Sequence, residues 1–237
     1  MYLITRPLAK LATTDSAFAG AGLSASVIAL QRTIELAEGI PRLQALLAAH
    51  PDAIVVVTST AAAIPLAEHL ATHPINQPVI AVGQSTAGIL THAGLTPIVP
   101  TAENSEGVLA LPLLNDCANR HILLLKGKGG RTTIPEQLTL RGARLNEVVL
   151  YERVPLIPPV FSRTCNWTQL AGIIATSSEQ AQALIKQFNT QPLTGVKWLT
   201  VSERIAQQLH QYGIRQADVC PKASDEALIT WIQQNWE

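Results

Sequence analysis

The sequence predicts an α/β protein built from two similar doubly wound parallel-sheet domains. Short, unbroken apolar runs alternate with amphipathic segments, and one long stretch of the chain repeats another. The composition agrees, because 47% of the 237 residues are hydrophobic and only 14% are charged, which suits packed cores rather than a disordered chain. A chain of this length can hold two small cores.

The charge balance and the apolar segments bear on the partners of the protein. Seventeen basic and seventeen acidic residues cancel, so no positive field gathers nucleic acid or an anionic membrane. Apolar runs such as 54–57 and 122–125 are too short to span a bilayer. The opening segment MYLITRPLAK carries charges where an export signal has an apolar run. We therefore expect a cytoplasmic protein with no nucleic-acid or membrane partner.

Potential metal ligands and thiols are few and widely spaced. Cys117, Cys165 and Cys220 form no CxxC pair, and we expect them to be buried free thiols. His69 and His73 have the spacing of a helical metal pair, but Pro74 follows directly and no third ligand is evident. The sequence therefore predicts no metal site.

An internal repeat is the most informative feature of the chain. The segment IVVVTSTAAAIPLAEHL from Ile54 resembles GIIATSSEQAQALIKQF from Gly172. The match continues through PVIAVGQSTAGIL and VKWLTVSERIAQQL, and it ends at Pro100 and Pro221. Each copy is predicted to run strand–helix–strand–helix–strand–helix. Its strands are continuous apolar runs, which is typical of strands buried on both faces of a parallel sheet.

Local signals support the predicted helices of the repeat, with one conflict. Ala181, Leu184, Ile185 and Phe188 form an apolar stripe at helical spacing. Gly94 and Gly213 follow their helices where a left-handed cap is favoured. The conflict is Pro65, which must lie in a first turn or displace its helix.

A second, shorter duplication surrounds the first. LITRP followed by GAGL and SASVIALQRTIEL resembles LLLKGKGGR followed by GARL and NEVVLYERVPL. Both copies end in long extended stretches, about 24–37 and 145–156, which we interpret as a two-stranded β linker between domains of the Rossmann or flavodoxin type. The order along the chain is short, long, short, long. The sequence leaves open whether each domain holds consecutive or interleaved repeats.

Small polar residues follow nearly every predicted strand, where ligands bind in open parallel sheets. One interpretation is helix capping, which suits serine and threonine. The other is a cleft lined with backbone N–H groups at helix N-termini, which binds carboxylates or phosphates without net charge. The candidate binding residues are Arg6, Thr58, Ser59, Ser85, Thr86, Thr176, Ser177, Ser178, Ser202 and Arg204.

The turn KGKGGR combines glycines with three cations at a strand exit. It matches neither the Walker P-loop nor the GxGxxG fingerprint, so it indicates no nucleotide. Two interpretations remain open, a plain strand-to-helix turn and an anion-facing turn in which Lys126, Gly127 and Arg131 contact the ligand.

No nucleophilic triad, carboxylate pair or HExxH motif is visible, so an enzyme of this design would act by positioning and mild proton transfer. Tyr2 and Tyr212 are predicted to be structural. Tyr151 lies in the inter-domain stretch VVLYERVP. It is either a packing aromatic or a proton donor to a substrate.

Seven motifs follow one another along the chain in the order ITRP, VVVTS, AVGQSTA, KGKGGR, VVLYERV, IIATSS and VSERIA. With these motifs in this order, the chain resembles the uroporphyrinogen-III synthase family along essentially its whole length. Two turns depart from the family pattern, namely 60–62, where relatives often carry asparagine, and 202–204, where a glycine–threonine turn is common.

The resemblance implies interleaved domains, 1–33 with 157–237 and 38–148, joined by linker strands 34–37 and 149–156. It implies a cofactor-free, metal-free lyase that acts as a monomer on hydroxymethylbilane, a linear tetrapyrrole with eight carboxylates. The substrate loses its terminal hydroxyl, its last pyrrole is inverted and the ring closes. Tyr151 matches the family tyrosine assigned to the leaving hydroxyl. The alternative is a two-lobed small-molecule binding protein of the periplasmic type.

Overall fold

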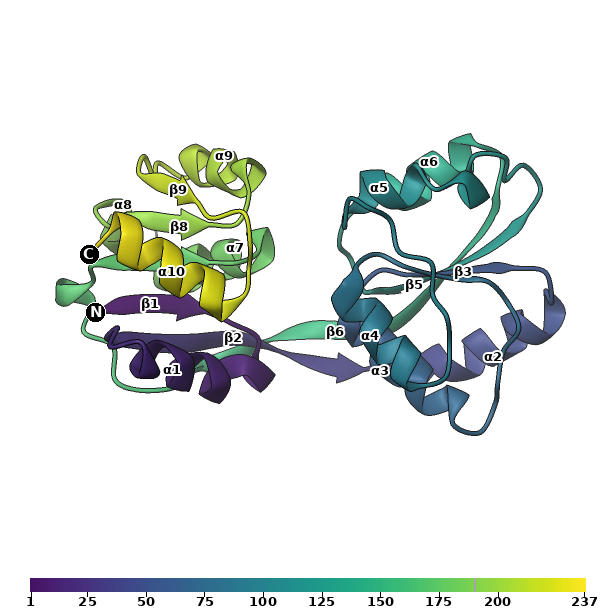
Figure 1. Ribbon diagram of the computed structural model, residues 1–237, viewed down its shortest axis with the longest axis horizontal. Coiled ribbons are helices and arrows are strands. Elements are labelled where there is room, and N and C mark those ends of the chain that lie inside the picture. The colour runs from purple at the N-terminus through teal and green to yellow at the C-terminus, as the bar shows by residue number, and fades with distance from the viewer. Residues whose placement is uncertain (190) are drawn as a thin grey trace. The chain divides into compact units, whose positions relative to one another are not determined.

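The computed structural model describes residues 1–189 and 191–237. The chain divides into two compact units, unit 1 from Met1–Arg32 with Val154–Glu237 and unit 2 from Thr33–Arg153. Figure 1 shows both units as sheets flanked by helices. Each unit is a parallel α/β structure, as the sequence predicts.

Unit 2 has the strand order β4-β3-β5-β6, and all its pairings are parallel. Its strands are β3 (Ile54–Val57), β4 (Val79–Ala81), β5 (His121–Gly127) and the first part of β6 (Arg144–Phe161). Its helices are α2 (Gly39–Ala49), α3 (Thr60–Leu70), α4 (Gln84–His92), α5 (Ser105–Leu109), the 3-10 turn Pro112–Leu114 and α6 (Thr133–Leu140).

Unit 1 has the strand order β2-β1-β7-β8-β9, again with parallel pairings. Its strands are β1 (Tyr2–Thr5), β2 (Ala25–Glu35), β7 (Gly172–Ala175), β8 (Trp198–Thr200) and β9 (Ala217–Val219), with the last part of β6. Its helices are α1 (Leu11–Gly20), α7 (Ser178–Phe188), α8 (Gln191–Thr194), α9 (Glu203–Gln211) and α10 (Asp225–Asn235), with 3-10 turns Leu8–Lys10 and Trp167–Gln169.

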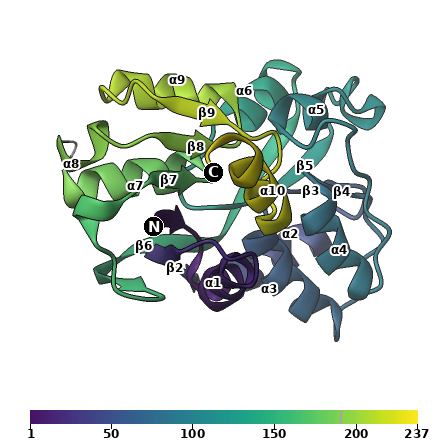
Figure 2. The same cartoon turned by 60° about the vertical axis from the view of Figure 1, so that its left-hand side comes forward.

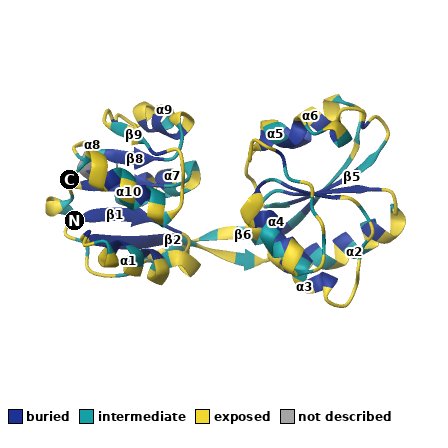
Figure 3. Cartoon of the chain, viewed as in Figure 1, coloured by how far each residue is buried: buried dark blue, intermediate teal, exposed yellow. Residues whose placement is uncertain are grey.

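Helices cover both faces of each sheet because the strands are apolar on both faces. Along β3, Val55 packs into one core cluster and Val56 into another, since successive side chains point to opposite faces. In unit 1, α7 and α9 cover one face of the sheet and α1 and α10 the other (Figure 2). The central strands are buried while the outer helix faces are exposed (Figure 3). The doubly wound prediction is confirmed.

The strand pairings answer the question that the repeats leave open. β1 of the first short repeat pairs with β7 of the second long repeat. β5 of the second short repeat pairs with β3 of the first long repeat. The repeats are therefore interleaved rather than consecutive.

The strands β2 and β6 carry the chain between the units, and each contributes to both. In unit 1, the Ser162 N–H donates to the Val27 carbonyl at 2.8 Å, and in unit 2 the Leu36 N–H donates to the Leu150 carbonyl at 2.9 Å. β6 has 18 residues, more than the sequence predicts. The two-stranded linker between the units stays a prediction.

The structure corrects two local expectations. Helix α3 begins at Thr60 with Pro65 in its interior, so the proline neither lies in the first turn nor displaces the helix. One backbone bond is lost, but Pro65 and Leu66 are buried in return. The third strand of the first repeat is reduced to an isolated bridge between Ile80 and Ile98, because Pro100, the next residue that would pair with β4, has no N–H to continue the ladder.

The remaining local predictions hold in part. Gly94 and Gly213 have φ angles of 90° and 81°, as left-handed helix caps require. All three cysteines are free; Cys117 and Cys220 are buried, whereas Cys165 is half-buried, and burial raises the pKa of the Cys165 thiol. Tyr212 is 40% exposed rather than packed. Among the described residues, no helix combines the length and apolar character that crossing a membrane requires.

Candidate functional site

The carboxyl ends of parallel strands meet at one edge of each sheet, and the candidate residues lie at these edges. In unit 2 they follow β3, β4 and β5, and in unit 1 they follow β1, β7 and β8. This is the position where open α/β sheets bind ligands.

Tyr151 lies at the edge of unit 2, beside the end of β5. The register of β6 against β5 shifts between Lys126 and Gly127, so that Tyr151 stands opposite Gly127. The Lys128 N–H donates to the Tyr151 carbonyl at 2.8 Å. The Arg153 guanidinium carbon lies 5.4 Å from the centre of the tyrosine ring. The bulge re-aims the side chain, as bulges near functional sites often do.

The Tyr151 ring is packed directly over the backbone of Gly127. A Cβ atom on Gly127 would lie 2.5 Å from the tyrosine Cζ and 2.9 Å from its hydroxyl. The tyrosine is only 5% exposed, so most of its ring is packed inside unit 2 rather than in contact with solvent. Only glycine leaves room for the ring in this position.

Ser59 links Tyr151 to the N-terminus of helix α3. Its Oγ lies 3.0 Å from the Tyr151 hydroxyl and accepts a hydrogen bond from the Ala62 N–H at 3.2 Å. Ser59 is thus both the N-cap of α3 and the hydroxyl partner of the tyrosine. The neighbouring Thr58 turns inward instead, and its Oγ1 donates to the Leu125 carbonyl at 3.0 Å.

The cations of the KGKGGR turn have protein partners. The Lys126 ammonium is 2.8 Å from the Glu147 carboxylate, and its side chain is 13% exposed. The Lys128 ammonium pairs with Glu152 at 2.9 Å, and this hydrogen bond raises the pKa of Lys128. Arg131 lies 3.9 Å from Glu106 and half-exposed at the end of the turn. Arg131 is therefore more accessible to a ligand than Lys126 is.

The N-terminus of helix α4 is covered by a carboxylate from its own unit. The Gln84 N–H donates to Glu103 Oε2 at 3.0 Å. In the same first turn, Ser85 is exposed and Thr86 is buried. Of the two candidates, Ser85 alone faces solvent.

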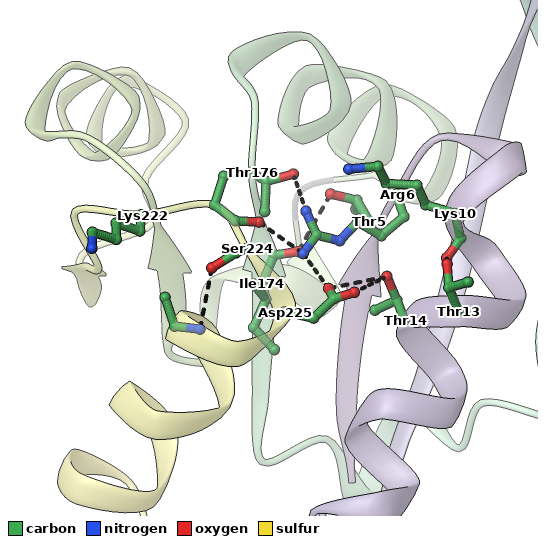
Figure 4. A network of polar contacts seen from close by, with 12 residues as sticks. Thr5, Arg6, Lys10, Thr13, Thr14, Ile174, Thr176, Lys222, Ser224 and Asp225 are labelled. Atoms are coloured by element: carbon green, nitrogen blue, oxygen red, sulfur yellow. Dashed lines mark hydrogen bonds and ion pairs between the residues drawn. The ribbon is translucent and has the colours of Figure 1, made fainter. Parts of the chain in front are cut away.

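Arg6 lies at the edge of unit 1 inside a polar network (Figure 4). Its side chain is 5% exposed and forms an ion pair with Asp225. Its other guanidinium nitrogen, Nη1, donates to Thr176 Oγ1 at 3.3 Å. Thr14 Oγ1 also donates to Asp225, at 3.0 Å to Oδ2. Arg6 thus joins the ends of β1 and β7 to the start of α10.

The remaining unit 1 candidates are helix-terminal residues. Ser177 caps α7, since its Oγ accepts from the Gln180 N–H at 3.2 Å. The Ser178 Oγ accepts from Arg204 at 3.0 Å. Ser202 is the N-cap residue of α9, without a side-chain capping bond. The structure therefore brings Thr176, Ser177, Ser178 and Arg204 together, whereas Thr58 and Lys126 are engaged within the protein.

The sequence interpretation missed three carboxylates at these edges, Glu103, Glu147 and Asp225. Asp225 follows Ser224 at a helix start, which is a recognisable capping signal. Its pairing with Arg6 spans 219 positions, and no local pattern indicates such a partner. Across residues 1–189 and 191–237, no group of three or more His, Cys, Asp or Glu side chains is placed to hold a metal ion.

Comparisons with known proteins agree on one family. The family model described as uroporphyrinogen-III synthase HemD matches residues 12–230. The uroporphyrinogen-III synthase of Escherichia coli K12 is 32% identical over 161 residues, 65% of this chain and 65% of that protein. The Salmonella typhimurium enzyme is 30% identical over 168 residues, 68% of each chain. The alignments thus span about two thirds of these relatives.

Solved structures show the same fold. A mutant uroporphyrinogen III synthase from the extremely thermophilic bacterium Thermus thermophilus matches with a TM-score of 0.68 at 15% identity, covering 98% of both chains. The uroporphyrinogen-III synthetase of Helicobacter pylori 26695 matches with a TM-score of 0.61 at 18% identity, again over 98% of both chains.

Proposed function

The chain belongs to the uroporphyrinogen-III synthase family, and from this premise we propose that it cyclises hydroxymethylbilane to uroporphyrinogen III. The reaction inverts the terminal pyrrole and releases water. No feature of the comparisons supports the alternative of a two-lobed binding protein. The enzyme is a lyase of tetrapyrrole biosynthesis that uses no cofactor.

The substrate carboxylates are bound at the carboxyl edges of the sheets. Hydroxyl groups and helix N-termini are suited to this task, because they bind carboxylates without a net positive charge. In unit 1 the accessible donors are Thr176 and its neighbours, and in unit 2 they include Ser85 and Arg131. Most of the rate advantage comes from holding the bilane in the folded conformation that leads to the inverted ring.

The observation that carries the catalytic assignment is the geometry of Tyr151. Its hydroxyl lies 3.0 Å from the Ser59 hydroxyl, at the N-terminus of a helix and over a glycine. Ser59 Oγ already accepts from the Ala62 N–H, so its own hydrogen is free to be donated to the tyrosine oxygen. The Tyr151 proton is then available to the departing hydroxyl, which leaves as water.

An assay of the product isomer tests the proposal. The pure protein, without added metal or nucleotide, is expected to convert hydroxymethylbilane to the type III isomer, measured by separating porphyrin isomers after oxidation. Tyr151→Phe is expected to lower kcat by up to about 100-fold, the lower end of what a general acid contributes. Its melting temperature should fall little, because one lost hydrogen bond costs about 1 kcal/mol.

Tyr212→Phe provides the matched control, since this tyrosine is exposed at the end of α9. Product that stays type I at high enzyme concentration contradicts the assignment of activity. Full activity in Tyr151→Phe contradicts only the role of the tyrosine and leaves positioning as the mechanism.

We also propose that the enzyme acts as a monomer in the cytoplasm. The three cysteines are free, as is usual in a reducing compartment. Sedimentation of the pure protein and fractionation of cells test these two statements.

A further inference from the structure

We infer that Arg6 and Asp225 form a positioning pair that holds the Thr176 hydroxyl as a hydrogen-bond donor toward the substrate. The inference rests on the proposed function, because it concerns how the edge of unit 1 binds a carboxylate of the bilane. It gives Arg6 a different role from that of a direct substrate ligand.

The contacts of Arg6 show why it does not bind the substrate itself. Its side chain is 5% exposed, and its charge is neutralised by Asp225. Arg6 Nη2 also donates to the Ala223 carbonyl at 2.9 Å. The remaining Nε is buried and has no partner among the described residues. The guanidinium is therefore an internal donor rather than a free cation at the surface.

Asp225 is itself held in place. It is the first residue of α10, whose N-cap Ser224 accepts from the Ala227 N–H at 3.3 Å. Thr14 of α1 donates to both carboxylate oxygens, at 3.1 and 3.0 Å. A carboxylate at a helix N-terminus is stabilised by the helix dipole. The pair is thus anchored to α1, β1 and α10 at once (Figure 4).

The consequence falls on Thr176, which follows β7. A guanidinium has only hydrogens to give, so Thr176 Oγ1 must accept in its 3.3 Å contact with Arg6. Within the part of the chain that the structure describes, no acceptor takes the Thr176 hydroxyl hydrogen. Thr176 is half-buried at the carboxyl edge. The hydroxyl hydrogen of Thr176 is therefore available to a ligand. Because Thr176 Oγ1 accepts from a charged donor, the hydrogen bond that it donates to the ligand is strengthened.

Kinetics of a mutant cycle test the pair. Thr176→Val, which removes the hydroxyl but keeps the shape, is expected to raise KM for hydroxymethylbilane by about threefold to tenfold, the effect of one hydrogen bond. kcat should change less. Thr176→Ser, which retains a hydroxyl, is expected to recover most of the lost affinity. Thr13→Val is the matched control, since Thr13 lies on the exposed first turn of α1 and its hydroxyl donates to the Lys10 carbonyl.

A second experiment replaces Arg6 and Asp225 together, so that neither is left as an unpaired buried charge. The double variant Arg6→Met with Asp225→Asn is expected to raise KM as much as Thr176→Val does. Adding Thr176→Val to it is expected to raise KM no further, because the hydroxyl is no longer oriented. Melting temperatures identify any variant whose fold is weakened.

The outcomes separate this inference from the proposed function. If the wild type forms type III product but the KM effects of Thr176→Val and of the double variant multiply independently, the positioning pair alone is overturned. In that case Arg6 and Asp225 have only a structural role, and removing them leaves the effect of Thr176→Val unchanged. Absence of turnover in the wild type overturns both. A KM for Thr176→Val equal to that of the wild type also overturns the pair.

Discussion

At the candidate site, the Tyr151 ring packs directly over the backbone of Gly127. The ring occupies the space where any other residue would carry a Cβ, 2.5 Å from the tyrosine Cζ. The φ angle of Gly127 is not positive, so the glycine is required by the approach of the ring rather than by the backbone conformation. The position of the Tyr151 ring therefore depends on Gly127, which has no side chain and takes no part in the reaction.

Gly127→Ala is expected to displace the Tyr151 ring. Overpacking of this kind costs about 1–3 kcal/mol of stability, and kcat should fall at least as far as in Tyr151→Phe. Gly88→Ala is the matched control, because a Cβ there meets nothing within 4 Å. In the interior of helix α4 this change should stabilise by about 0.5–1 kcal/mol. Steady-state kinetics and thermal unfolding measure both, and a Gly127→Ala protein with wild-type values would show that the ring is free to move.

At the scale of elements, the sequence predicts what depends on local pattern. The four-residue strands 54–57 and 172–175 are evident because both their faces are buried, and the caps at Gly94 and Gly213 because one conformation is required there. The third strand of the first repeat, which forms only a bridge at Ile98, is overpredicted, because hydrophobicity alone does not reveal that Pro100 lacks an N–H for the ladder. The partners of the candidate site, such as Asp225 for Arg6, are invisible because they come from distant segments.

One pair of elements in unit 2 is joined by stacked histidines away from the candidate site. The rings of His50, after α2, and His121, at the start of β5, lie 3.6 Å apart with an angle of 12° between them. Burial, His50 and Arg144 lower the pKa of His121. In α3, burial and His73 lower the pKa of His69 in the same way.

His69 and His121 are expected to make the free energy of unfolding depend on pH. Because their folded pKa values lie below the ordinary value of 6.5, the unfolded chain binds more protons in this range. The free energy of unfolding should therefore be highest above pH 6.5 and fall as the pH drops toward the folded pKa values. Urea unfolding between pH 5 and pH 7.5 measures the slope, and His121→Gln should reduce it. His92→Gln, on the exposed side of α4, is the control; stability that rises on acidification would contradict the prediction.

At the scale of the whole molecule, the two units differ in how the chain forms them. Unit 2 is one continuous segment, Thr33–Arg153, whereas unit 1 combines both ends of the chain. Unit 2 also has core clusters on both faces of its sheet, made from its own residues. We therefore infer that its folding needs no residue from unit 1.

The fragment 33–153 is expected to fold alone. Circular dichroism and cooperative urea unfolding measure this, because a domain with its own core unfolds in one transition. Val56→Asp in the fragment is the control, since Val56 is fully buried and an unpaired buried charge abolishes the core. A fragment that unfolds without a transition would show that unit 2 depends on the chain ends.

The discontinuity of unit 1 also sets an order of events during translation. β1 pairs with β2 on one side and with β7 on the other, with Tyr2 opposite Gly172. A ribosome that adds ~5–20 residues per second needs roughly 10–30 s to reach that partner. Throughout this time Leu3 and Ile4, which end up fully buried, lack one of their two neighbouring strands, while all of unit 2 is synthesised. We therefore expect strands β1 and β2 of the nascent chain to stay open to chaperone binding until β7 has been synthesised.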